Sequence, residues 1–237
     1  MKKSSLIWTS VLLLCVLLAS CSTLAVSEED FDYEGDAFTY YIEEVYAEQI
    51  RRYYIPLLEQ WEEEAYFEQG LSALPAYYYE GDPLDNVGFG FVDLDNDGYL
   101  ELVIGAILHA DKDPAVFEIW TLEDEVPVML AQGGVRNRYV LMYEKENDAW
   151  YVANEAASSA ASHATYCLML ENGKFEVIQG IMFDAAADEQ NPWFMTYDLD
   201  WNVSNDQTID EETACAVLES NRKLYTALEY FPYFFCE

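Results

Sequence analysis

The sequence predicts an α+β fold, with a single domain over residues 36–237 in which helices flank an antiparallel β-meander. Apolar residues recur at spacings of three and four from residue 36 to about residue 69, which is the period of an amphipathic helix. From residue 87 to about residue 181 the period becomes two, as in strands, and short polar or glycine turns separate the segments. A second stripe with helical spacing follows residue 208.

Residues 1–20 have the features of a bacterial lipoprotein signal peptide. Lys2 and Lys3 precede an apolar run that is too short for a convincing membrane-spanning helix. The run ends in the letters LASC, whose last residue is Cys21, and this ending resembles a lipobox. The resemblance implies cleavage before Cys21 and attachment of a lipid to it. We therefore expect an exported protein, lipid-anchored to the outer face of the bacterial cell membrane.

Residues 21–35 are small, polar and acidic, which predicts a flexible tether between the membrane and the domain. Removal of the signal would leave nine basic residues against 45 acidic ones, a formal charge of −36. So acidic a surface repels nucleic acid, and we expect no nucleic-acid partner. Apolar residues still make up 52% of the chain, which is enough to build a folded core.

The first helical segment, residues 36–69, is expected to form one helix or a kinked helix pair. Asp36 is placed to cap its beginning and Gly70 to end it. Pro56 lies inside the segment and predicts either a kink or the first turn of a second helix.

About eight strands are expected after this helical segment. The first two lie on either side of an aspartate-rich loop and contain VGFGF and LELVI; the others are VFEIWTL, VPVMLA, RYVLMY, AWYVAN, TYCLML and FEVIQGI. Asn172-Gly173 predicts a tight hairpin between the last two, because both residues tolerate positive φ. The strands could form one meander, or two blade-like sheets over residues 87–134 and 138–182.

Three aspartates alternate in the middle of the apolar segment FVDLDNDGYLELVIG. If the chain wraps around one point, the side chains of Asp93, Asp95 and Asp97 can converge on it, and Gly98 permits the sharp turn. The carbonyl of Tyr99 could supply a further oxygen. Oxygen ligands in this number are those that Ca²⁺ prefers. The pattern therefore predicts a structural calcium site.

This loop differs from an EF-hand, because Ile104 occupies the twelfth position, where an EF-hand has a bidentate glutamate. With strands on both sides, it resembles the D-x-D-x-D-G-x-x-[DE] calcium loop of FG-GAP and VCBS blades. The motif occurs once in this form. Carried over residue by residue, the resemblance implies carboxylate ligands from Asp93, Asp95, Asp97 and Glu101 and the carbonyl of Tyr99.

The segment NPWFMTYDLDWNVSN contains a second candidate ligand site. Trp193 and Trp201 lie close in sequence to Asp198 and Asp200, with Asp206 nearby, and aromatic platforms beside carboxylates are used in sugar recognition. The alternative is a surface loop whose tryptophans pack back over the sheet, since large aromatic side chains are mostly buried.

A C-terminal helix is predicted after Thr208. Thr208 and Glu211 have the spacing of a capping box, and the helix is expected to end before Pro232. Its apolar stripe is formed by Ala214, Val217, Leu218, Asn221, Leu224 and Leu228.

The cysteines of the mature domain are odd in number. Cys15 lies in the predicted signal peptide and Cys21 would carry the lipid, which leaves Cys167, Cys215 and Cys236. A bridge between Cys215 and Cys236 is one alternative; the other, which we favour, is free and mostly buried thiols.

The order of these elements resembles a group of uncharacterised acidic lipoproteins of anaerobic Gram-positive bacteria, which implies localisation and fold but no activity. We expect a lipid-anchored binding or structural module of the envelope, stabilised by one calcium ion, whose partner is an envelope glycan or a surface protein. The alternative is an envelope-associated glycan hydrolase with paired carboxylates near Trp193 and Trp201. A transporter's solute-binding component fits poorly, because the chain lacks two alternating strand-helix lobes.

Overall fold

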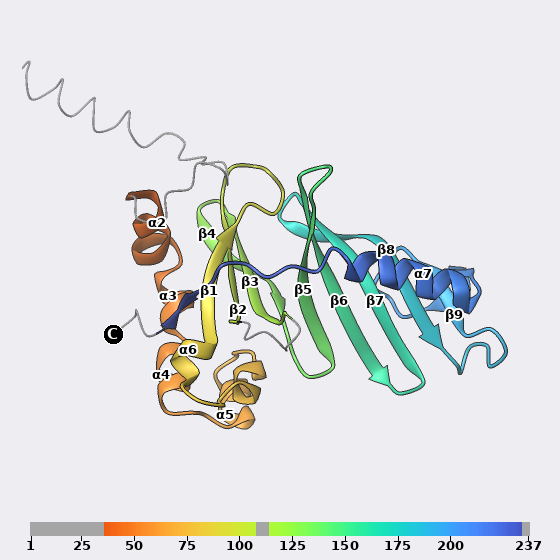
Figure 1. Cartoon of the computed structure of the whole chain (residues 1–237), viewed down its shortest axis with the longest axis horizontal. Coiled ribbons are helices and arrows are strands. Elements are labelled where there is room, and N and C mark those ends of the chain that lie inside the picture. The colour runs from red at the N-terminus through yellow and green to blue at the C-terminus, as the bar shows by residue number, and fades with distance from the viewer. Residues whose placement is uncertain (1–35, 108–113, 234–237) are drawn as a thin grey trace, which may run out of the picture.

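The computed structural model describes residues 36–107 and 114–233. In this part of the chain an antiparallel sheet of 11 strands runs through the molecule, with short helices packed at one end and one longer helix at the other (Figure 1). The predicted signal peptide, the tether and Cys21 lie outside the described residues. None of the described helices is long and apolar enough to cross a membrane.

The sheet order is β10-β9-β8-β7-β6-β5-β3-β2-β1-β11, and β4 pairs with β3 beside that path. The strands are β1 (Val87–Val92), β2 (Glu101–Ala106), β3 (Val116–Glu123), β4 (Val126–Gln132), β5 (Asn137–Glu144), β6 (Ala149–Ser159), β7 (Ser162–Glu171), β8 (Lys174–Asp184), β9 (Trp193–Thr196), β10 (Gln207–Thr208) and β11 (Phe231–Pro232).

The α+β class agrees with this architecture, but the expected strand number and the two blade-like sheets are wrong. The eight predicted segments correspond to β1 to β8, and three strands of two to four residues extend the sheet at its edges. One continuous sheet forms because Val116 at the start of β3 pairs with Tyr139 of β5. The additional strands, β9 to β11, are too short to show a period of two in the sequence, and they form because they pair with residues distant in the chain.

The helical end contains α2 (Asp36–Tyr40), a π-helical turn (Tyr41–Val45), α3 (Ala47–Arg51), α4 (Tyr54–Leu58), α5 (Glu63–Glu68), a 3₁₀ turn (Leu74–Tyr77) and α6 (Pro83–Asn86). The predicted single helix or kinked pair is therefore wrong: the segment is broken into short helices. Pro56 lies inside α4, and the chain instead leaves helical geometry at Gln60, whose φ is +51°. Gly70 ends α5 as predicted, with φ of +66° and its N–H bonded to Phe67 O.

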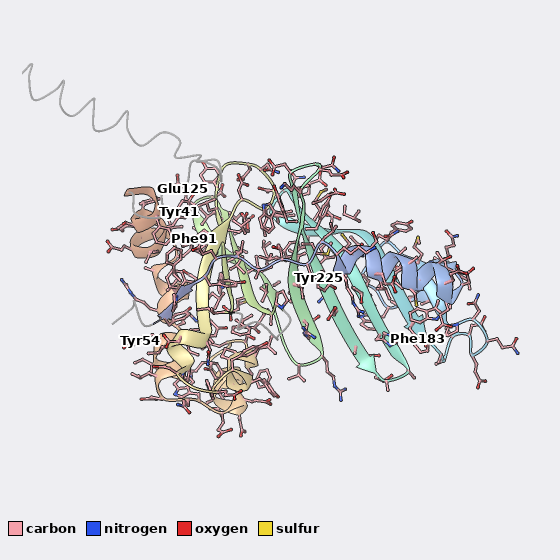
Figure 2. All side chains as sticks on the ribbon, in the orientation of Figure 1. Tyr41, Tyr54, Phe91, Glu125, Phe183 and Tyr225 are labelled. Carbon is pink, nitrogen blue, oxygen red and sulfur yellow. The ribbon has the colours of Figure 1, made fainter. Side chains whose placement is uncertain are left out.

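Buried tyrosines fasten this helical end to the sheet. The hydroxyl of Tyr46 donates to the carbonyl of Leu100 at 3.0 Å, and the hydroxyl of Tyr53 donates to the carboxylate of Glu118 at 2.7 Å. Figure 2 shows Tyr41 beside Phe91, and the two ring centroids are 5.7 Å apart. The helices thus cover one face of β1 to β3 and hold the end of the aspartate loop.

The chain returns across the other face of β1 and β2 after the last helix. In Figure 1 this dark blue segment runs back over the sheet to β11 beside β1. Glycines make room for it: a Cβ at Gly105 would lie 2.6 Å from the hydroxyl of Tyr230 and 2.8 Å from the carbonyl of Ala115. Both faces of β1 and β2 are therefore buried.

The last helix is α7 (Glu211–Arg222), which lies over β8 and β9 (Figure 1). The predicted capping box is wrong, because Thr208 pairs with Phe194 in the sheet and Asp210 caps the helix by accepting the N–H of Thr213 at 2.7 Å. The helix also ends earlier than expected, at Arg222.

The described cysteines do not form a disulfide. Cys167 is buried and Cys215 is exposed, and both are free thiols. The expectation of free thiols therefore holds for these two, while the expectation of burial is wrong for Cys215. Cys236 lies outside the described residues.

Candidate metal centre

The acidic loop, residues 93–101, connects two neighbouring strands. Val92 at the end of β1 pairs with Glu101 at the start of β2, so the loop leaves and re-enters the sheet at one point. One carboxylate oxygen from each of Asp93, Asp95 and Glu101 lies within 4.8 Å of the others. Three of the predicted ligands are thus brought together.

The place where these three carboxylates meet is largely buried. Asp93 is 7% exposed and Glu101 is 2% exposed, while Asp95 is partly exposed. Leu94, between the two aspartates, is 3% exposed and packs into the core on one face of the sheet. Burial of carboxylates is costly unless hydrogen bonds or an opposite charge compensate it.

Hydrogen bonds from the loop backbone orient Asp93. Its carboxylate accepts the N–H of Asp97 at 3.1 Å and the N–H of Gly98 at 2.9 Å. These contacts require a tight wrap, and Asn96 and Gly98 provide it with φ of +57° and +88°. The glycine predicted to allow the turn does so.

Glu101 is held by two donors. Its carboxylate accepts the N–H of Leu94 and the hydroxyl of Thr121, each at 2.8 Å. Asp95 differs, because its Oδ1 is buried and has no hydrogen-bond partner among the described residues. The three carboxyl groups therefore converge with one oxygen still unpaired.

Burial raises the pKa of all three groups. Desolvation is the largest cause in each, and it brings the pKa of Glu101 to about 8 and that of Asp95 to about 6, with the charge of Asp97 adding to the shift of Asp95. Such shifts show that negative charge is poorly compensated here. A bound cation would favour the ionised forms.

The donor set fits a hard cation, of which Ca²⁺ is the one predicted from the sequence. Ca²⁺ binds oxygen at about 2.3–2.6 Å, so two ligands on opposite sides of the ion can be about 5 Å apart. The carboxylate oxygens of Asp93, Asp95 and Glu101 lie within 4.8 Å of one another, which is close enough for one ion to contact all three. All the donors are carboxylate oxygens, the ligand type that hard cations such as Ca²⁺, Mg²⁺ and Mn²⁺ prefer.

Asp97 and Tyr99, the other predicted ligands, lie on the exposed side of the loop. Oδ1 of Asp97 accepts the N–H of Tyr99 at 2.8 Å, and the Tyr99 side chain is 43% exposed. The Asp97 carboxylate is not part of the convergent group, and the ligand predicted from Tyr99 is its backbone carbonyl, so both roles stay predictions.

A cavity of about 350 Å³ borders the acidic loop. It is lined by Leu94, Asp95 and Asn96 from the loop and by residues from the ends of β6 and β7, including Trp150 and Glu171. Asp95 is therefore the carboxylate that a solvated ion would meet first.

The tryptophan loop, residues 193–206, holds the second set of side chains singled out in the sequence. Trp193 contacts the rings of Phe183, labelled in Figure 2, and His163, at centroid distances of 4.9 and 6.2 Å. Trp201 is half-buried against the core. The aspartates Asp198 and Asp200 are exposed. The tryptophans thus pack back over the sheet.

Comparison of the chain with protein-family models, with curated proteins and with solved structures finds no match.

Proposed function

We propose that the acidic loop binds one Ca²⁺ and that the protein is a lipid-anchored binding or structural module on the outside of a bacterial cell. The observation that carries the calcium site is the convergence of Asp93, Asp95 and Glu101 with a buried, unpaired oxygen on Asp95. The export and the anchor rest on the signal sequence and Cys21.

The role proposed for the ion is structural. The loop is connected to β3 through Thr121 and to the helical end through the bond from Tyr46 to the carbonyl of Leu100. An ion bound by the loop's carboxylates would therefore stabilise the contacts that connect the loop, β3 and the helical end of the molecule. Binding to the folded state alone stabilises it by mass action.

A binding module is favoured over the glycan hydrolase. Trp193 packs on the ring of Phe183 from the neighbouring strand at a centroid distance of 4.9 Å, and Asp198 and Asp200 are exposed on the surface. A hydrolase needs two carboxylates held on opposite sides of a bound sugar. An envelope glycan or a surface protein remains the proposed partner.

Calorimetric titration of Ca²⁺ into the metal-stripped full chain tests the calcium site. We expect saturable binding in the range of extracellular modules, with Kd about 10⁻⁴ to 10⁻³ M. Asp95→Ala should abolish binding at this site, while Glu125→Gln, which removes an exposed acid at the β3–β4 turn (Figure 2), should leave it unchanged. Weak, unsaturable heat that is identical in all three proteins would refute the site.

A further inference from the structure

The loop between β9 and β10 repeats the spacing of the acidic loop. Both loops have acids at the first, third and ninth positions and an acid or amide at the fifth: Asp93, Asp95, Glu101 and Asp97 in one, and Asp198, Asp200, Asp206 and Asn202 in the other. Each connects antiparallel neighbours in the sheet. The fourth position has φ of +57° at Asn96 and +58° at Trp201.

A buried tyrosine points at this second loop. Tyr166 of β7, Gly180 of β8 and Thr196 at the end of β9 lie side by side in register. A Cβ at Gly180 would be 2.7 Å from the ring of Tyr166 and 2.7 Å from the methyl group of Thr196. The ring of Tyr166 therefore lies across Gly180 on the side of Thr196, the last residue of β9, after which the second loop begins.

Two polar atoms are left unpaired at this place. Tyr166 is 1% exposed, yet its hydroxyl makes no hydrogen bond within the described part of the chain. Oδ2 of Asp206 is also buried and has no partner there, while the Thr196 hydroxyl donates to the carbonyl of Asp198 at 3.4 Å. Trp201 and Val203 of this loop pack against the buried cluster that contains Tyr166. In agreement with that contact, burial and then the charges of Asp198, Asp206 and Asp200 raise the pKa of Tyr166 to about 12.

Buried polar groups in folded proteins are nearly always paired, with protein, water or a ligand. An unpaired hydroxyl and an unpaired carboxylate oxygen that face one acidic loop therefore indicate a bound species that both can contact. Three carboxylates around it select a cation, and the donors are again all oxygens, as a hard divalent ion requires.

We propose that residues 198–206 form a second site for a calcium-sized divalent cation, with Asp198, Asp200 and Asp206 as carboxylate ligands and the Tyr166 hydroxyl as a neutral oxygen facing the ion. This site is separate from the acidic loop, and it gives the aspartates near the tryptophans a role other than sugar hydrolysis.

The second site is more open than the first. Asp198 and Asp200 are exposed, and the group of described carboxylates gathered within 4.8 Å is the one at Asp93, Asp95 and Glu101. The sixth position is Val203, at the start of a 3₁₀ turn (Val203–Asn205), in place of the glycine of the first loop. Binding must draw the second loop together, so its affinity is the lower of the two.

Titration of Ca²⁺ into the full chain and its variants tests the proposal. We expect two saturable events in the wild type. Asp95→Ala should remove the tighter event alone, and Asp200→Ala should remove the weaker one alone. Tyr166→Phe, which keeps the ring, should weaken only the second event, by about tenfold. Glu189→Gln, an exposed acid in the neighbouring loop, is the matched control and should change neither.

Fluorescence supplies a second measurement in case Asp200→Ala fails to fold. Trp201 lies within the second loop, so its emission should change with the weaker event, and the change should persist in Asp95→Ala and disappear in Asp206→Asn. A single event that Asp95→Ala abolishes and that Asp200→Ala, Asp206→Asn and Tyr166→Phe leave unchanged would overturn the second site while preserving the first. A single binding event that Asp200→Ala, Asp206→Asn and Tyr166→Phe weaken and that Asp95→Ala leaves unchanged would overturn the first site and support the second.

Discussion

Replacing Glu101 with glutamine should stabilise the metal-free protein and abolish its response to calcium at the acidic loop. Glu101 is 2% exposed, and burial raises its pKa from 4.5 to about 8. The folded state therefore holds its proton more tightly than the unfolded state does. The resulting stability is fully present below about pH 4.5 and is lost as the pH rises toward 8.

The expected change in the free energy of unfolding follows from the shift in the pKa of Glu101. Each pKa unit corresponds to 1.36 kcal/mol, so ionising Glu101 in the folded protein costs up to about 5 kcal/mol by pH 9, and roughly half of that after solvent relaxation. Glutamine can keep both contacts, because its carbonyl can accept the Leu94 N–H and its amide can donate to the Thr121 hydroxyl. At 2–4 °C per kcal/mol, the relaxed value of about 2.5 kcal/mol makes the variant melt roughly 5–10 °C above the wild type at pH 9 without metal.

The assay is thermal unfolding of wild type, Glu101→Gln and the control Glu125→Gln in a chelator at pH 5, 7 and 9, repeated with excess Ca²⁺. We expect equal stability at pH 5, a gain for Glu101→Gln at pH 9, and a calcium-induced rise at the acidic loop in the other two proteins. If Glu101→Gln follows the wild-type pH profile and responds equally to calcium, the buried-carboxylate reasoning is wrong.

Calcium at 100 times Kd should stabilise the wild type by about 2.7 kcal/mol per site, measured as a rise in Tm, and a Tm independent of calcium would contradict the structural role. Calcium affinity should fall by roughly one to two orders of magnitude from pH 8 to pH 6, because calcium binding requires ionised carboxylates. Burial raises the pKa of Glu101 to about 8 and that of Asp95 to about 6, so both hold protons in this range. Calorimetry at fixed ionic strength measures the affinity, and an affinity that does not change with pH would count against these ligands. Gly105→Ala should destabilise by about 1–3 kcal/mol in urea unfolding, since its Cβ would contact the Ala115 carbonyl at 2.8 Å, whereas Gly134→Ala, with nothing within 4 Å, should be close to neutral. Cys21→Ser should release the protein from the membrane fraction of a bacterial host and prevent incorporation of labelled fatty acid; unchanged labelling would refute the anchor.

The first candidate site was predictable because its information is local. Spacing alone indicated that Asp93 and Asp95 share a loop with Glu101, and the φ of Gly98 confirms the expected turn. The second loop has the same spacing of acids, at its first, third and ninth positions, but lacks the glycine at the sixth. Its aspartates also lie beside two tryptophans, a pattern that favours a sugar site in the sequence alone.

The sequence by itself determined what depends on neighbours along the chain: the periods of β1 to β8, the Asn172-Gly173 hairpin with φ of +53° and +73°, and the stop of α5 at Gly70. Only the tertiary structure decided what depends on distant residues. β11 exists because it pairs with β1, and Thr208 joins β10 instead of capping a helix because Phe194 is beside it. The unpaired hydroxyl of Tyr166 also became visible only there, because its direction is set by Gly180 on the next strand. Local backbone preferences are short-ranged, whereas burial and pairing are properties of the whole fold.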